Sequence, residues 1–151
     1  MRVISSLMAL SSVLLGASAA ADGKIDPAAL VRSFHQALSS GNRDATLALL
    51  DPGVVIFEQG EAEMSRDEYV AQHLDADIEF SRATSQQVID QRTQSHGKSA
   101  WVLTTSETSG SFRGRDVSSR NVETMVLEKT SGGWRIMHIH WSSHFQESAK
   151  P

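Results

Sequence analysis

The sequence has 151 residues, of which 40% are hydrophobic and 21% are charged, and its formal net charge is -4. These values are typical of one globular domain, and they lack the basic excess by which proteins bind nucleic acid. The chain contains no cysteine, which excludes a disulfide framework and a thiol nucleophile. We therefore expect a small acidic domain that is stabilised by its hydrophobic core and has no nucleic-acid partner.

The first residues have the pattern of a signal peptide. Arg2 supplies a positive start, residues 3–16 form an apolar run diluted by serines, and Ala17-Ser18-Ala19 resembles a cleavage site. The run is too short and too interrupted to span a membrane, although an uncleaved anchor is an alternative. We expect residues 1–21 to be removed on export. Residues 22–151 would then form a single domain in the periplasm or outside the cell, with no membrane attachment.

The first half of that domain predicts helices. A helix begins after Asp26, where a proline occupies the first turn, and a second, shorter helix that Asn42 can cap stops at Pro52. A short buried strand follows at residues 54–57. Ser65 and Glu68 have the spacing of a capping box for a third helix, which runs to about residue 74 or continues to residue 80.

The second half predicts four long strands, over residues 82–94, 99–112, 115–129 and 134–146. They are about twice as long as a typical strand of five or six residues, so the sheet must twist and curl through bulges. Helices followed by an antiparallel meander indicate the α+β class. We expect a cone-shaped, curled antiparallel or mixed sheet wrapped around the N-terminal helices.

The last strand is rich in histidine and tryptophan. Strict alternation places His138 and His140 on one face and Ile139 and Trp141 on the other. We predict that the two histidines form the polar floor of the cone, where Glu58 and Asp77 would be the nearest carboxylate acceptors. The alternative is that bulges turn the histidines outward and place Ile139 and Trp141 inside the cone.

Other polar and aromatic residues are candidates for ligand binding. Tyr69, His73 and Asp77 are spaced four residues apart, so they share one flank of the third helix. Glu123 has apolar neighbours on its strand face, where a raised pKa would mark a site, although an exposed rim position is the alternative. Trp101 or Trp141 would line the mouth of the cone or a dimer face.

The order of elements and the final Gly-Trp-Arg-Ile-Met-His-Ile-His-Trp-Ser-Ser run (residues 133–143) resemble the nuclear transport factor 2-like superfamily, in its SnoaL-like branch. The last strand and the Phe57-Glu58 pair also resemble the association domain of calcium/calmodulin-dependent protein kinase. The resemblance extends over residues 26–146 and implies the cone fold. It does not imply one activity, because members include isomerases, cyclases, dehydratases, ligand binders and oligomerisation modules.

We therefore expect an exported protein that binds a small organic ligand in an apolar pocket. If it is an enzyme, His138, His140 and Glu58 would perform acid/base chemistry. The ketosteroid isomerase pattern pairs a carboxylate base with a tyrosine and a protonated acid, whereas this sheet offers histidines in place of that acid.

Two alternatives stay open. One is a non-catalytic assembly module. The other is a periplasmic metal binder, in which His138 and His140 would be joined by Glu58, His73 or Asp77. The favoured prediction is that no metal or cofactor is bound, because no motif for either occurs. We also expect a homodimer that forms through the outer face of the sheet.

Overall fold

The computed structural model describes residues 26–146, so the predicted signal peptide lies outside the described residues. None of the helices in this part of the chain is long and apolar enough to cross a membrane. The elements, in chain order, are α1 (Pro27–Ser40), α2 (Arg43–Leu49), β1 (Leu50–Glu58), β2 (Glu61–Glu63), α3 (Arg66–Gln72), α4 (Leu74–Ala83), β3 (Thr84–His96), β4 (Ser99–Phe112), β5 (Arg115–Thr130) and β6 (Gly133–Phe145).

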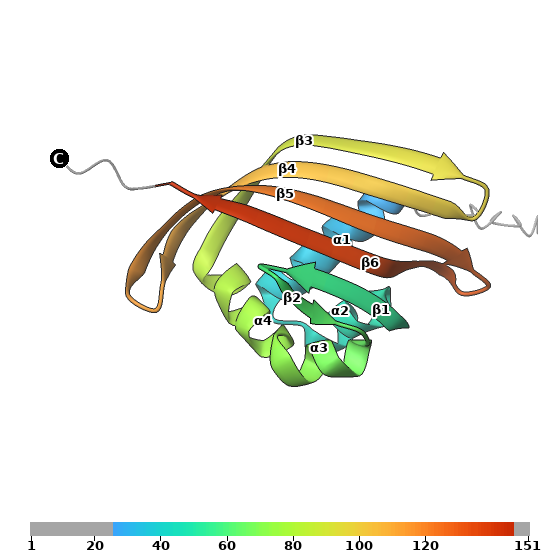
Figure 1. Ribbon diagram of the computed structural model, residues 1–151, viewed down its shortest axis with the longest axis horizontal. Helices are drawn as coiled ribbons and strands as arrows, with labels where there is room; N and C mark the ends of the chain where they lie inside the picture. Colours follow the sequence, from blue (N-terminus) through green and yellow to red (C-terminus); the bar gives the residue numbers. More distant parts are fainter. Residues whose placement is uncertain (1–25, 147–151) are drawn as a thin grey trace, which may run out of the picture.

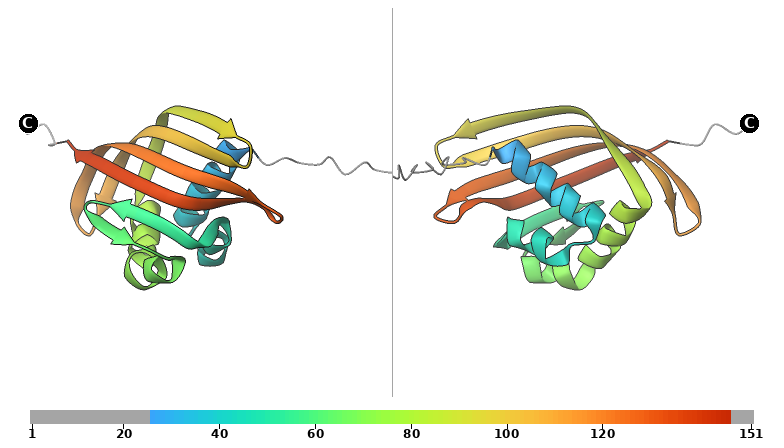
Figure 2. Two further views of the ribbon diagram at one scale, coloured as in Figure 1. Left: turned by 45° about the vertical axis from the view of Figure 1, so that its right-hand side comes forward. Right: turned by 180° about the vertical axis from the view of Figure 1, so that it is seen from behind.

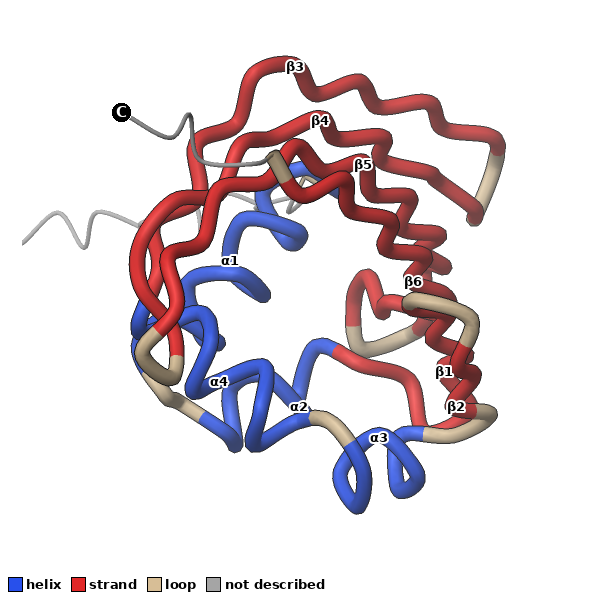
Figure 3. Tube along the Cα trace, turned by 60° about the vertical axis from the view of Figure 1, so that its left-hand side comes forward, coloured by secondary structure: helices blue, strands red, loops and turns tan. Residues whose placement is uncertain are grey.

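The six strands form one curled sheet in the order β2-β1-β6-β5-β4-β3 (Figure 1). Only β1 and β6 are parallel, and the other neighbouring strands are antiparallel. The helix α1 crosses the concave side of the sheet, as the rear view in Figure 2 shows. Seen from one end, α1, α2, α3 and α4 complete a ring with the sheet (Figure 3). The predicted α+β cone with a mixed sheet is confirmed.

Helix α1 begins and ends as its sequence predicts. Pro27 occupies its first turn, and Gly41 adopts a left-handed conformation (φ 72°) just past its end. The Gly41 amide donates to Leu38 O at 2.9 Å, and the Asn42 amide donates to Ala37 O at 2.8 Å. The inner side of the helix is buried in the core and carries Leu30, Val31, Phe34 and Leu38.

The predicted third helix is two helices. Its start is capped as expected, because Ser65 Oγ accepts a hydrogen bond from the Glu68 amide at 3.1 Å. Glu68 Oε2 in turn accepts one from the Met64 amide at 2.7 Å. The helical conformation is interrupted at His73 (φ -124°, ψ -29°), and α4 begins at the buried Leu74. The interruption lets α4 turn along the open end of the cone.

A bulge in β6 decides which of its side chains face the interior. Val126 of β5 pairs with His138, but the next residue, Leu127, pairs with Ile136, so Met137 has no partner. The alternation of faces therefore reverses at Met137, and Ile136 and Ile139 are both buried in the core. His138 and His140 consequently lie on the outer face. The prediction that they form the floor of the cone is wrong, and the bulge alternative applies.

Gly110 of β4 allows the chain to turn closely from α4 into β3. Its φ is 150°, and a Cβ atom there would lie 2.9 Å from both Ala83 O and Thr84 Cα. Any side chain would therefore push the α4–β3 corner away from β4. This contact holds α4 over the open half of the sheet.

Candidate functional site

The open half of the cone contains a cavity of about 180 Å³. Its wall combines His35 from α1, Glu58 at the end of β1, Asp77 and Phe80 from α4, and Trp141 from β6. The rest of the wall includes hydroxyl and amide side chains of β3, β4, β5 and β6 and a few apolar side chains, such as Leu38 and Phe145, but neither lysine nor arginine. The cavity thus brings one imidazole and two carboxyl groups to a common space.

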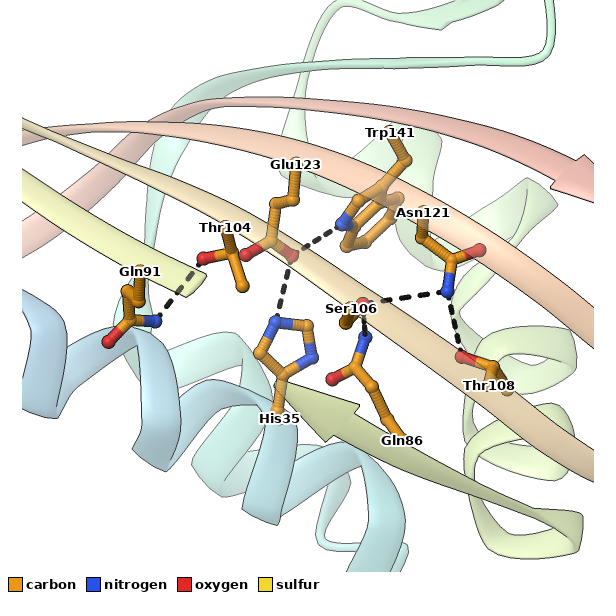
Figure 4. Close-up of polar contacts among 9 residues, drawn as sticks. All are labelled: His35, Gln86, Gln91, Thr104, Ser106, Thr108, Asn121, Glu123 and Trp141. Carbon is orange, nitrogen blue, oxygen red and sulfur yellow. Dashed lines mark hydrogen bonds and ion pairs between the residues drawn. The ribbon is translucent and has the colours of Figure 1, made fainter. Parts of the chain in front are cut away.

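His35, Glu123 and Trp141 form a hydrogen-bonded group at this cavity (Figure 4). His35 Nε2 lies 2.8 Å from Glu123 Oε2, and Trp141 Nε1 donates to the same oxygen at 2.7 Å. An imidazole nitrogen that faces a carboxylate carries the proton, which leaves Nδ1 of His35 as an acceptor. Figure 4 shows Nδ1 turned away from Glu123, on the side of Gln86, which also lines the cavity.

The Glu123 carboxylate is charged at neutral pH even though it is only 7% exposed. Burial raises its pKa, but the charge and hydrogen bond of His35 and the hydrogen bond of Trp141 outweigh that effect. The net result is a pKa below the ordinary value, so the raised pKa expected from apolar neighbours is wrong. A charged Glu123 holds the imidazole of His35 in one orientation and one tautomer.

The two carboxyl groups in the wall, Glu58 and Asp77, have raised pKa values, in contrast to Glu123. Burial raises the pKa of Glu58, and it raises the pKa of Asp77 to about 7. The charge of nearby Glu58 adds to the effect on Asp77, while a hydrogen bond from the Tyr69 hydroxyl, 2.7 Å from Asp77 Oδ2, opposes it. Near neutral pH part of the Asp77 population is therefore protonated, and that carboxyl group can donate a hydrogen bond.

Two further ionisable groups stand behind this wall. Glu63 of β2 is 2% exposed, and its Oε1 forms a hydrogen-bonded ion pair with His73 Nδ1. The charge of His73 lowers the pKa of Glu58, whereas that of Glu63 raises it. The pair therefore influences the cavity electrostatically without lining it.

Residues 28–146 match the family model of the SnoaL-like domain. The chain belongs to the SnoaL-like family. A candidate ketosteroid isomerase from Shewanella frigidimarina NCIMB 400 is 32% identical, with a TM-score of 0.74 over 80% of this chain and 98% of that one. The resemblance seen in the sequence is confirmed, and no curated protein shows significant similarity.

Two more distant structures share the fold of this SnoaL-like domain. The CaMKII hub of S. rosetta is 22% identical, with a TM-score of 0.66 over 76% of this chain and 92% of that one. A candidate dehydratase of the nuclear transport factor 2-like family from Streptomyces avermitilis is 19% identical, with a TM-score of 0.67 over 78% and 92%. At these identities the likeness establishes the fold alone.

The SnoaL-like fold brings three of the sequence-predicted residues into the cavity wall, namely Glu58, Asp77 and Trp141. Glu123 lies beneath the wall and acts through His35. Tyr69 is fully buried and reaches the site through its bond to Asp77. The roles predicted for these residues in binding or catalysis stay predictions.

Four other predicted residues do not line the cavity. His73 stands behind Glu58, as described above. His138 and His140 lie on the outer face of the SnoaL-like sheet, where both rings pack edge-on against Phe57 at 5.1 and 6.4 Å. Trp101 stacks on His96 at 5.8 Å, on the side of β4 opposite to its buried residues. The predicted placement of His138 and His140 around the ligand is wrong, because the Met137 bulge directs them outward. The alternation of β4 places Trp101 on the outer face, so only the dimer-face alternative stays a prediction for it.

The proposed metal set is also divided between the two sides of the sheet. His138 Nδ1 lies 2.8 Å from the carbonyl oxygen of Val55, while Glu58 and Asp77 face the interior. Within residues 26–146, no three His, Asp or Glu side chains are arranged to bind a metal ion. The metal-binding alternative therefore loses the ligand set on which it was based.

Sequence reasoning missed His35, although its position carried a signal. It follows Phe34 and stands beside the apolar line of α1, so its ring lies on the flank of a helix that the sheet covers. It also missed the neutral polar residues of the sheet, among them Gln86 and Asn121. Those residues lie on strands whose inward face could be assigned only once the register was known.

Proposed function

We propose that this SnoaL-like protein binds a small organic molecule and transfers a proton on it, with His35 as the base. The observation that carries the proposal is the 2.8 Å contact between His35 Nε2 and Glu123 Oε2 at the cavity. Glu123 fixes the tautomer in which Nδ1 accepts a proton, and a base positioned in this way contributes roughly 10²–10⁴-fold to a rate. Glu123 is a positioning residue in this scheme.

The opposite wall supplies the acid. A carbonyl oxygen bound near Asp77 would accept a hydrogen bond from its protonated carboxyl group, whose pKa is about 7. His35 Nδ1 removes a proton from the carbon next to that carbonyl, and the electron pair moves onto the oxygen. The protonated imidazole then returns the proton to the same carbon or to one conjugated with it. Similarity to the candidate ketosteroid isomerase of Shewanella frigidimarina supports this class of reaction.

Proton exchange tests the proposal directly. The protein is incubated in D₂O with dihydroxyacetone or cyclohexanone, and the loss of α-proton signals is followed by ¹H NMR. We expect catalysis by the wild type, a loss of at least about 100-fold in His35→Gln, and a smaller loss in Glu123→Gln. His96→Gln, which changes a histidine on the outer side of the sheet, is the matched control. Equal rates for His35→Gln and the wild type would disprove the role of His35.

The outer face of the sheet supports a second proposal, that the protein is a homodimer. Phe57 of β1, Leu103 of β4 and Val122 of β5 are 41%, 39% and 52% exposed. With His140 between Phe57 and the next strands, they form a weakly polar surface on the central strands. A second copy of the chain provides a self-complementary cover for such a face through a two-fold axis.

Light scattering after gel filtration tests the dimer. We expect twice the monomer mass for the wild type and the monomer mass for Leu103→Lys. Val88→Lys, which adds the same charge to the edge strand β3, should remain dimeric. A monomeric wild type at about 100 μM, a concentration at which weak specific dimers form, would rule out this interface.

We also propose that the protein is exported and loses residues 1–21. The support is the charged start, apolar run and small-residue end of that segment. The intact mass of the protein recovered from its own host tests this, and a chain that still begins at Met1 would exclude cleavage.

A further inference from the structure

A second hollow, of about 350 Å³, adjoins the cavity between α1, α4 and the start of β3. The two hollows share five wall residues, which are His35, Phe80, Ser81, Gln86 and Thr108. His35 therefore stands where the hollows meet. A ligand long enough to occupy both would pass the imidazole at its middle.

The walls of both hollows are rich in uncharged hydrogen-bonding groups. The second hollow adds Gln36, Ser39, Thr84 and Ser85, and none of its wall residues is an acid, a lysine or an arginine. On a sheet face that covers a core, apolar side chains would be expected at such positions. Their replacement by hydroxyl and amide groups indicates that this part of the interior faces polar partners.

A hydrogen-bonded ladder holds several of these groups in fixed positions (Figure 4). Asn121 Nδ2 donates to Thr108 Oγ1 at 2.9 Å, and Gln86 Nε2 donates to Ser106 Oγ at 3.2 Å. Ser119 Oγ donates to Asn121 Oδ1 at 3.0 Å. Fixing the amides and hydroxyls reduces the entropy lost when a ligand binds to them.

The residues of the two walls disfavour two other classes of ligand, namely anions and large apolar molecules. An anion would meet the carboxyl groups of Glu58 and Asp77 with no lysine or arginine in either hollow to offset them. A large apolar ligand would bury the donors and acceptors of the walls that the ladder's own bonds leave unused, at a cost of roughly 1–3 kcal/mol for each group left unpaired.

We infer that the ligand is an uncharged, polyhydroxylated molecule of two linked parts, in the manner of a disaccharide or a glycoside. One part would occupy each hollow, and the link would lie beside His35. Its hydroxyl groups would pair with the ladder, and the C–H face of a ring would pack on Trp141 or Phe80. The inference rests on the proposed function for the use of His35, which would act on the open-chain carbonyl of a reducing sugar, but the choice of ligand rests on the walls.

Binding measured without turnover tests the inference. The purified protein is titrated by ligand-observed NMR with maltose, cellobiose and trehalose, and with glucose as the one-part probe. Gluconate and cyclohexylmethanol represent the anionic and apolar classes. We expect at least one disaccharide to bind about tenfold more tightly than glucose, since a few added hydrogen bonds give that factor, and gluconate and cyclohexylmethanol to bind more weakly than that disaccharide.

Filling the second hollow provides the matched variant. Ser39→Phe should reduce the preference for the disaccharide over glucose by at least about fivefold, because Ser39 lines only the second hollow. Ser33→Phe, at an exposed serine of the same helix outside both hollows, should retain the wild-type preference. Equal affinity for glucose and every disaccharide, tighter binding of gluconate or cyclohexylmethanol, or no sugar binding would overturn the inference. If the sugar prediction fails but the wild type catalyses proton exchange, the proposed function is retained. If sugars bind as expected but no exchange occurs, the ligand inference is retained and the proposed function is wrong.

Discussion

Trp141 and Glu123 are register partners on β6 and β5, and the indole nitrogen of Trp141 donates a 2.7 Å hydrogen bond to Glu123 Oε2. The same tryptophan stacks on Phe34 of α1, with 6.3 Å between the ring centroids. Trp141 therefore joins the sheet, the first helix and the buried carboxylate. Trp141 faces inward because Met137 is unpaired, and the bulge at Met137 reverses the faces of the residues that follow it in β6. One extra residue in the strand therefore places Trp141 at the site.

Removing the indole donor should destabilise the protein. We expect Trp141→Phe to lower the free energy of unfolding at pH 7 by about 1–3 kcal/mol, because a buried charged acceptor loses a partner. The lowered pKa of Glu123 contributes stability above the ordinary carboxyl pKa, and this is lost as the pH falls through the folded-state value. In the variant that loss should begin at a higher pH. Urea unfolding between pH 3 and pH 7 measures both effects, and equal curves for Trp141→Phe and the outer-face control Trp101→Phe would contradict them.

The raised pKa of Asp77 should make the free energy of unfolding depend on pH in the opposite direction. Its pKa rises from 3.8 to about 7 on folding, so the folded state retains a proton that the unfolded state releases. Stability should therefore decrease as the pH rises from about 4 to above 7, by up to roughly 4 kcal/mol, and then level off above the folded-state pKa. Asp77→Asn should remove this decrease, whereas Asp75→Asn, an exposed acid of the same helix, should retain it. Urea unfolding at several pH values measures this dependence. If the free energy of unfolding of Asp77→Asn falls with pH as steeply as that of the wild type, the raised pKa does not belong to Asp77.

The corner at Gly110 should tolerate no side chain. Gly110→Ala adds a Cβ atom 2.9 Å from Ala83 O, at a φ of 150° that alanine rarely adopts. We expect a loss of about 1–3 kcal/mol in the free energy of unfolding. Gly53→Ala is the control, because its Cβ would meet only Asp51 Oδ1, at 3.5 Å. If both variants melt at the same temperature, the close approach at Gly110 does not constrain the fold.

The long strands and the helix ends could be predicted because their signals are local. Alternating residues and glycine turns defined β4 as residues 99–112, which are also its bounds in the structure. The bulge at Met137 could not be predicted, because it depends on how β6 pairs with β5 and Met137 differs in no way from an ordinary strand residue. His35 was missed for a similar reason. Its partner, Glu123, is 88 residues away in the sequence, and only the fold brings the two together.

The last prediction separates the two possible sites for histidine chemistry. His138→Ala removes the contact between the ring and the carbonyl oxygen of Val55, so it should lower the free energy of unfolding by about 1 kcal/mol. His140→Ala should have almost no effect on the stability of the single chain, because that side chain is exposed on the outer face of the monomer. Neither change should alter proton exchange, whereas His35→Gln should slow it by at least about 100-fold. Exchange rates and urea unfolding of the three variants, compared side by side, provide the measurement. A loss of more than about tenfold in exchange for His140→Ala would move the site to the outer face, since a general base contributes at least that much.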